Sequence, residues 1–105
     1  MLPNMRPVPS VRWDTAHMDG ENIIIHLAAH DPRLHILVLP REVLEDAVRA
    51  SGGDLIRLAH GNRRAVEAAS QSAWQRDDLR EVFEVTGPRR NVQLWLTLED
   101  FGTLH

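Results

Sequence analysis

The sequence has no cysteine, no lysine and no long apolar run. Without cysteine the chain has no disulfide, no thiolate metal site and no thiol nucleophile. All twelve basic residues are arginine, a bias typical of GC-rich coding. No stretch approaches the roughly 20 apolar residues of a membrane-spanning helix. The opening MLPNMRPVPS has three prolines and no hydrophobic signal region, so we expect a cytoplasmic protein with no membrane partner.

Chain length and net charge limit the classes of protein that remain possible. A chain of 105 residues with 43% hydrophobic content is typical of one globular domain. We expect residues 1–10 to form an extended tail and residues 11–105 to form a single α+β domain. The formal net charge of −3 provides no strong basic field to attract nucleic acid.

Two apolar segments in the first half are typical of strands. Residues 22–29 (NIIIHLAA) and 34–39 (LHILVL) are rich in branched residues, and HDPR between them is typical of a turn. If the turn occupies residues 30–33, Ala29 pairs with Leu34. That register puts six side chains of the two strands on the core face: Ile23, Ile25, Leu27, Leu34, Ile36 and Val38. The side chains on the outer face are then Ile24, His26, Ala28, His35, Leu37 and Leu39.

The middle of the chain predicts two helices. Pro40 is suited to a helix start, and Gly52 and Gly53 are suited to its end. Asp54 is a natural N-cap for a second helix that runs to about Arg76.

The last third predicts a hairpin. With residues 87–90 as its loop, Val85 pairs with Val92 and Phe83 with Leu94, which leaves Val82 and Trp95 on the outer face. Residues 11–18 allow a short fifth edge strand before Asp19-Gly20, a hairpin signal. The predicted fold is a four-stranded antiparallel sheet with two helices on one face, in the order β-β-α-α-β-β.

Asn62 lies at the apolar spacing of the second helix, where an aliphatic residue is expected. Its amide could bond the backbone of a neighbouring loop as a buried polar group, because an unpaired buried amide is costly. Gly61 would then admit the close approach of another backbone. Alternatively, the helix breaks there and Asn62 caps the second piece. A role in ligand binding is a third interpretation.

Several of these segments resemble a bacterial family known as domain of unknown function 1488. The resemblance rests on Trp13-Asp14, LPREVLEDA, NRRAVEAASQSAWQR and VQLWLTLEDF, and spans roughly residues 13–101. Pro40, where the family has a Ser or Thr cap, and the long hairpin depart from that pattern. The resemblance implies a small α+β fold and a bacterial origin, and it implies no activity.

Catalytic and metal-binding patterns are weak. The sequence has no G-x-S-x-G, no P-loop and no G-x-G-x-x-G. His26 and His35 would be diagonal neighbours on the outer face, but two ligands are too few for a zinc site. We therefore expect no catalytic residues, no cofactor, no metal and no enzymatic activity.

The apolar outer face carries the functional prediction. A sheet face left open to water is usually more polar, and an apolar patch usually marks a partner surface. We expect a homodimer or a protein partner bound through Ile24, Leu37, Leu39, Val82 and Trp95. The tail with Trp13 could instead fold across this face. The alternative function is accessory nucleic-acid binding through Arg63, Arg64, Arg89 and Arg90.

Overall fold

The computed structural model describes residues 9–28, 34–76, 79–83 and 90–102, with the backbone alone for residues 80–83 and Arg90. The described residues form an α+β fold whose three α-helices lie between the third and fourth strands along the chain. The elements are β1 (Ser10–Asp19), β2 (Asn22–Ala28), β3 (Leu34–Pro40), α1 (Arg41–Val48), α2 (Leu55–Gly61), α3 (Arg63–Arg76), β4 (Leu79–Phe83), β5 (Arg90–Trp95) and a 3-10 helix, η1 (Leu98–Phe101).

The five described strands form one mixed sheet in the order β1-β2-β3-β5-β4. β3 and β5 are parallel, and the other neighbouring pairs are antiparallel. The prediction of a purely antiparallel sheet in the order β-β-α-α-β-β was therefore wrong. A parallel pair needs a long crossover, and the three helices between β3 and β4 provide one. β1 is a ten-residue edge strand that begins at Ser10, a residue expected in the tail.

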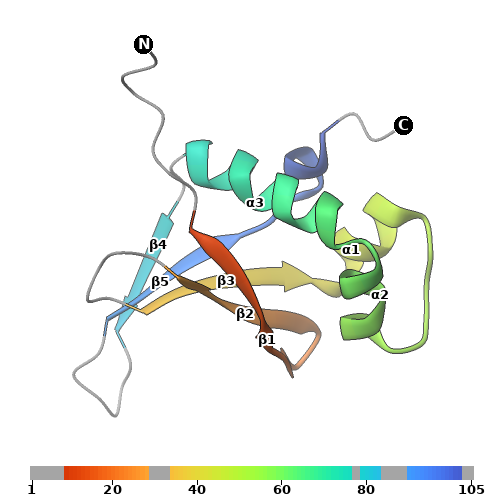
Figure 1. The fold of residues 1–105 in the computed structure, drawn as a ribbon, viewed down its shortest axis with the longest axis horizontal. Coiled ribbons are helices and arrows are strands. Elements are labelled where there is room, and N and C mark those ends of the chain that lie inside the picture. Colours follow the sequence, from red (N-terminus) through yellow and green to blue (C-terminus); the bar gives the residue numbers. More distant parts are fainter. Residues whose placement is uncertain (1–8, 29–33, 77–78, 84–89, 103–105) are drawn as a thin grey trace.

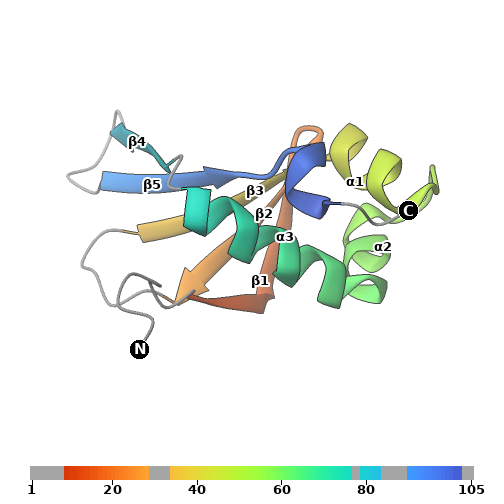
Figure 2. The ribbon, with the colours of Figure 1, turned by 90° about the horizontal axis from the view of Figure 1, so that it is seen from above.

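The helices lie to one side of the sheet. Figure 1 shows α3 and η1 above the strands, and Figure 2 shows them crossing in front of the sheet, with α1 and α2 at one end of it. No helix among the described residues is long and apolar enough to cross a membrane. The core joins the helices to one sheet face and includes Ile23, Ile25, Leu27, Leu37, Leu39, Leu44, Leu55, Ala59, Val66, Ala69, Ala73, Trp74, Leu94, Leu96 and Phe101.

The pairing of β2 with β3 differs from the predicted register by one residue. Ile23 pairs with Leu39 and Ile25 with Leu37, whereas the sequence pattern had paired Ala29 with Leu34. Because side chains alternate between faces, a slip of one residue moves every side chain of a strand to the opposite face. Leu37 and Leu39 therefore lie in the core and not on the outer face, and both are fully buried.

The β4–β5 hairpin is displaced by four residues from its predicted pairing. Leu79 pairs with Leu94 and Glu81 with Val92, and Arg90, expected in the loop, is the first residue of β5. A shift of four is even, so the predicted faces of β5 are retained. The predicted partner Val85 lies outside the described residues.

The predicted single helix over residues 54–76 is two helices. Asp54 caps α2 as expected, with Oδ1 accepting from the backbone N–H groups of Ile56 at 3.1 Å and Arg57 at 3.2 Å. α2 ends at Gly61, and α3 begins at Arg63. Asn62 has a non-helical φ of −115° and ψ of 31°, which turns the chain between the two helices.

Candidate functional site

The sheet surface opposite the helices has an apolar centre, which we call the open face: Ile24, Ile36, Val38 and Trp95. The register places Ile24, Val38 and Trp95 in one row across β2, β3 and β5. Among the described residues, no helix lies below the strands on this side (Figure 1). The apolar side chains that alternate with this row face the core instead.

Burial differs along the open face. Val38 is 2% exposed and Ile36 is 9% exposed, so both are already almost fully removed from solvent in the single chain. Ile24 and Trp95 are half-buried. The surface that this face presents to a partner is therefore contributed mainly by Ile24 and Trp95.

The indole of Trp95 is held by its own strand. Trp95 Nε1 donates to Gln93 Oε1 at 2.8 Å. A buried indole N–H usually needs an acceptor, and here that acceptor is supplied within the chain. The ring can therefore be covered by a second surface without leaving its N–H group unsatisfied.

The structure separates the five residues that the sequence assigned to an interface. Ile24 and Trp95 lie on the open face, whereas Leu37 and Leu39 are core residues. Val82 pairs with Asn91, and its side chain lies outside those described. The sequence pattern missed Ile36 and Val38. Positions 36–39 are all apolar, so alternation gave no signal for which pair faces outward.

Trp13 lies on the helix side of the sheet and not across the open face. Its Nε1 donates to Glu67 Oε2 at 3.0 Å, and its ring meets the His60 ring edge-on at a centroid distance of 5.5 Å. Trp13 therefore joins β1 to α2 and α3. The rest of the predicted tail, residues 1–8, lies outside the described part of the chain.

Asn62 lies between α2 and α3, and its side chain forms a hydrogen bond to the last turn of α2. The side-chain Nδ2 of Asn62 donates to the Leu58 carbonyl at 2.9 Å. The backbone carbonyl of Asn62 accepts from Ala65 N at 3.0 Å and Val66 N at 3.1 Å. The predicted helix does break at Asn62, but the side-chain amide of Asn62 bonds to α2, which precedes it, and does not cap α3, which follows it. Asn62 is half-buried, and a Cβ on Gly61 would meet no atom within 4 Å, so no backbone approaches closely there.

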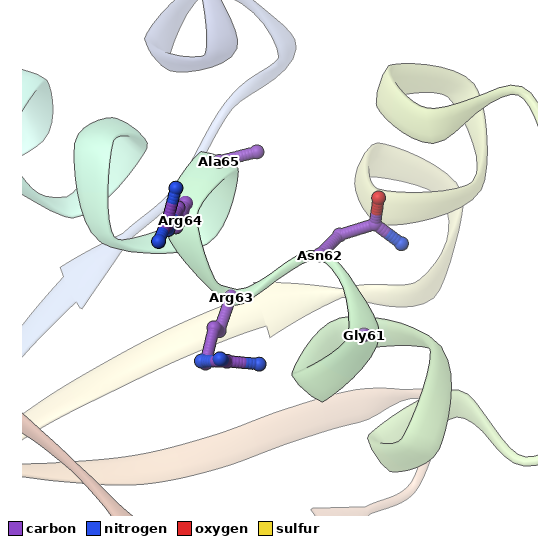
Figure 3. A pocket seen from close by; sticks show the side chains of 5 residues that line it. All are labelled: Gly61, Asn62, Arg63, Arg64 and Ala65. Atoms are coloured by element: carbon purple, nitrogen blue, oxygen red, sulfur yellow. The ribbon is translucent and has the colours of Figure 1, made fainter.

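A hollow lies at the junction of α2 and α3, lined by Gly61, Asn62, Arg63, Arg64 and Ala65. Figure 3 shows the Arg63 and Arg64 side chains pointing away from the Asn62 amide. Both arginines are exposed, and the ion pairs between described residues use other arginines: Arg12, Arg41 and Arg76. The other proposed nucleic-acid contacts, Arg89 and the Arg90 side chain, lie outside the described part.

The histidine pair suggested by the sequence does not form. His26 alternates with the core residues Ile25 and Leu27, whereas His35 pairs with Val92 on the core face and is 3% exposed. His35 instead packs against Trp74, with ring centroids 5.7 Å apart. Within the described ranges, no group of three or more His, Cys, Asp or Glu side chains is placed to hold a metal ion.

Comparisons of this chain with family models, curated proteins and solved structures find no match in any of the three.

Proposed function

We propose that this protein is a non-enzymatic interaction module that binds a second copy of itself through the open face. The observation that carries the proposal is the row Ile24, Val38 and Trp95 on the side of the sheet opposite α3 and η1. A domain with one sheet and helices on one side leaves the other sheet face available. Ile24 and Trp95, the half-buried members of this row, would gain free energy when another surface covers them.

A second copy fits this face because Ile24, Ile36, Val38 and Trp95 are all uncharged, while Arg12, a charged residue on the same side of the sheet, lies farther out on the edge strand β1. A two-fold dimer brings each residue of the patch close to the same patch on its partner, so like charges would repel across the axis. Ile24, Val38 and Trp95 avoid that penalty. Polar groups at the neighbouring positions, His26 and Gln93, supply the polar surround that is usual for interfaces.

Trp95 is the expected anchor of the dimer. Tryptophan is enriched among the residues that contribute most binding free energy, and its side chain is most effective near the centre of an interface. The bond to Gln93 fixes the indole in advance, which reduces the entropy lost when the ring is covered.

A bacterial cytoplasmic location is part of the proposal. The lack of cysteine is consistent with a reducing compartment. The resemblance to the domain of unknown function 1488 family supports the bacterial origin.

Sedimentation of the wild-type chain over a hundredfold concentration range tests the proposal. We expect a mass equal to two chains at high concentration and dissociation on dilution. The protein concentration at which half of the dimer dissociates should change little between low and high salt, because the contact is apolar. A single-chain mass throughout would reject the homodimer. If deletion of residues 1–8 then produced a dimer, the tail would be the segment that covers the open face.

Nucleic-acid binding remains the second candidate, and it is favoured by the exposure of Arg63 and Arg64, which form no ion pair with another residue in the described part of the chain. Binding of a labelled duplex should then weaken steeply with salt, because phosphate contacts release counterions. Reversal of both charges, in Arg63→Glu with Arg64→Glu, should abolish it. Fluorescence anisotropy with no salt-dependent signal would reject this candidate and leave the homodimer unaffected.

A further inference from the structure

A second histidine pair lies beside the open face, on the edge strand β1 and its neighbour β2. The rings of His17 and His26 meet edge-on, with centroids 6.3 Å apart and planes at 85°. Two imidazoles that share one metal ion, at metal–nitrogen distances of about 2.0–2.1 Å, have centroids about 4.5 Å apart when they bind at a right angle and about 6.4 Å apart when they bind from opposite sides. The observed separation of 6.3 Å therefore suits an ion bound between the two rings, with the rings on opposite sides of it.

The proton on His17 is placed for metal binding. His17 Nδ1 lies 2.9 Å from the Thr15 carbonyl oxygen, which can only accept, so Nδ1 carries the hydrogen. In the neutral ring this leaves the lone pair on Nε2. Metal-bound histidines usually have this arrangement, in which the second ring nitrogen donates to a backbone carbonyl and fixes the ring.

Thr15 joins the two histidines. Its hydroxyl accepts from the backbone N–H of His26 at 2.8 Å and donates to the Arg12 carbonyl at 2.7 Å, while its carbonyl accepts from His17. These bonds lie in the irregular pairing of β1 with β2 between Arg12 and His17. Bulges often redirect side chains in this way, and here the irregularity brings His17 toward His26.

We propose that His17 and His26 together bind one late first-row divalent metal ion, Cu²⁺ or Ni²⁺, with water completing the coordination. Imidazole nitrogen is a favoured ligand for both ions, and both accept tetragonal sites that mix nitrogen with oxygen. A structural zinc site needs four protein ligands, which the described residues do not supply here. Arg12, which pairs with His26 across the two strands, forms an ion pair with Asp14 at 3.5 Å.

Titration calorimetry of the untagged chain with NiCl₂, and separately with CuCl₂, tests the site. We expect one ion per chain, with affinity at least about tenfold weaker in His17→Ala and in His26→Ala. His60→Ala is the matched control, because His60 is an exposed histidine on α2 outside the pair, and its affinity should equal that of wild type. Binding should also fall at acid pH, since protonated imidazole cannot coordinate.

A second measurement does not depend on any variant. Substoichiometric Cu²⁺ should broaden the ring signals of His17 and His26 in the wild-type NMR spectrum before those of His60. Loss of less than tenfold in either alanine variant, an equal loss in His60→Ala, or uniform broadening of all the histidines would each overturn the proposal.

Discussion

Arg76 at the end of α3 and Asp100 in η1 form a two-point ion pair. Arg76 Nη2 lies 2.8 Å from Asp100 Oδ2, and Arg76 Nε lies 3.3 Å from Oδ1. The Asp100 side chain is 2% exposed, whereas that of Arg76 is 37% exposed. The carboxylate also accepts from Thr97 N at 2.9 Å, Thr97 Oγ1 at 3.1 Å and Ser72 Oγ at 3.4 Å. Asp100 therefore fixes η1 to α3 on the covered side of the sheet.

This difference in bonding predicts that alanine substitution lowers the free energy of unfolding more at Asp100 than at Arg76. Asp100→Ala removes every one of these bonds and should lower the free energy of unfolding by about 2–4 kcal/mol. Arg76→Ala leaves the three bonds from Thr97 and Ser72 in place and should cost only about 1–2 kcal/mol. Urea denaturation measures both. An Arg76→Ala cost equal to or above that of Asp100→Ala would show that the ion pair, and not the hydrogen bonds from Thr97 and Ser72, holds η1.

Leu37 tests the register of the sheet. The structure places it fully buried in the core, so Leu37→Ala should cost about 2–5 kcal/mol through lost burial and a cavity. Ile24→Ala is the comparison, because Ile24 is half-buried on the open face and should cost less in stability while weakening self-association. Urea melts at one protein concentration and sedimentation distinguish the two effects. A small stability cost at Leu37 would favour the register predicted from sequence.

Local signals in the sequence located most elements of this fold. The branched run at residues 22–28 and the apolar run at residues 34–39 are strands, Asp54 caps a helix, and Trp95 lies on the face that its spacing indicated. Each of these depends on neighbours within a few residues. Asp100 also illustrates the limit, since its bond to Arg76 spans 24 positions and no local pattern reveals it.

The errors arose where non-local geometry decides. Residues 36–39 are all apolar, so their pattern does not distinguish the two faces, and the predicted register depended on the assumed length of the turn. A register shift of one residue moved Leu37 from the surface to the core. The parallel pairing of β3 with β5 depends on where three helices return the chain, which composition does not encode. The pairing of His17 with His26 was not predicted for the same reason, since the irregularity of β1 brings the two rings together.

Gly61 offers a stabilising substitution. It ends α2 without a positive φ, and a Cβ there would meet no atom within 4 Å. Gly61→Ala should raise the free energy of unfolding by about 0.4–1 kcal/mol, chiefly by restricting the unfolded chain. Gly102→Ala is the matched control. Gly102 has φ 65° and ψ −146°, a conformation that only glycine adopts readily, so alanine should cost about 1–3 kcal/mol. Thermal melts that rank the two variants in the opposite order would contradict this description of the α2–α3 junction.

The native mass of Trp95→Arg beside wild type tests the central claim most directly. Light scattering at several concentrations should give a two-chain mass for wild type and a one-chain mass for Trp95→Arg, because two arginines would meet across the dimer axis. Leu98→Arg is the control, since Leu98 is 51% exposed on η1, away from the open face, and that variant should remain a dimer. Circular dichroism must show the same fold in all three. A one-chain mass for folded wild type, or a two-chain mass for folded Trp95→Arg, would contradict self-association through the open face.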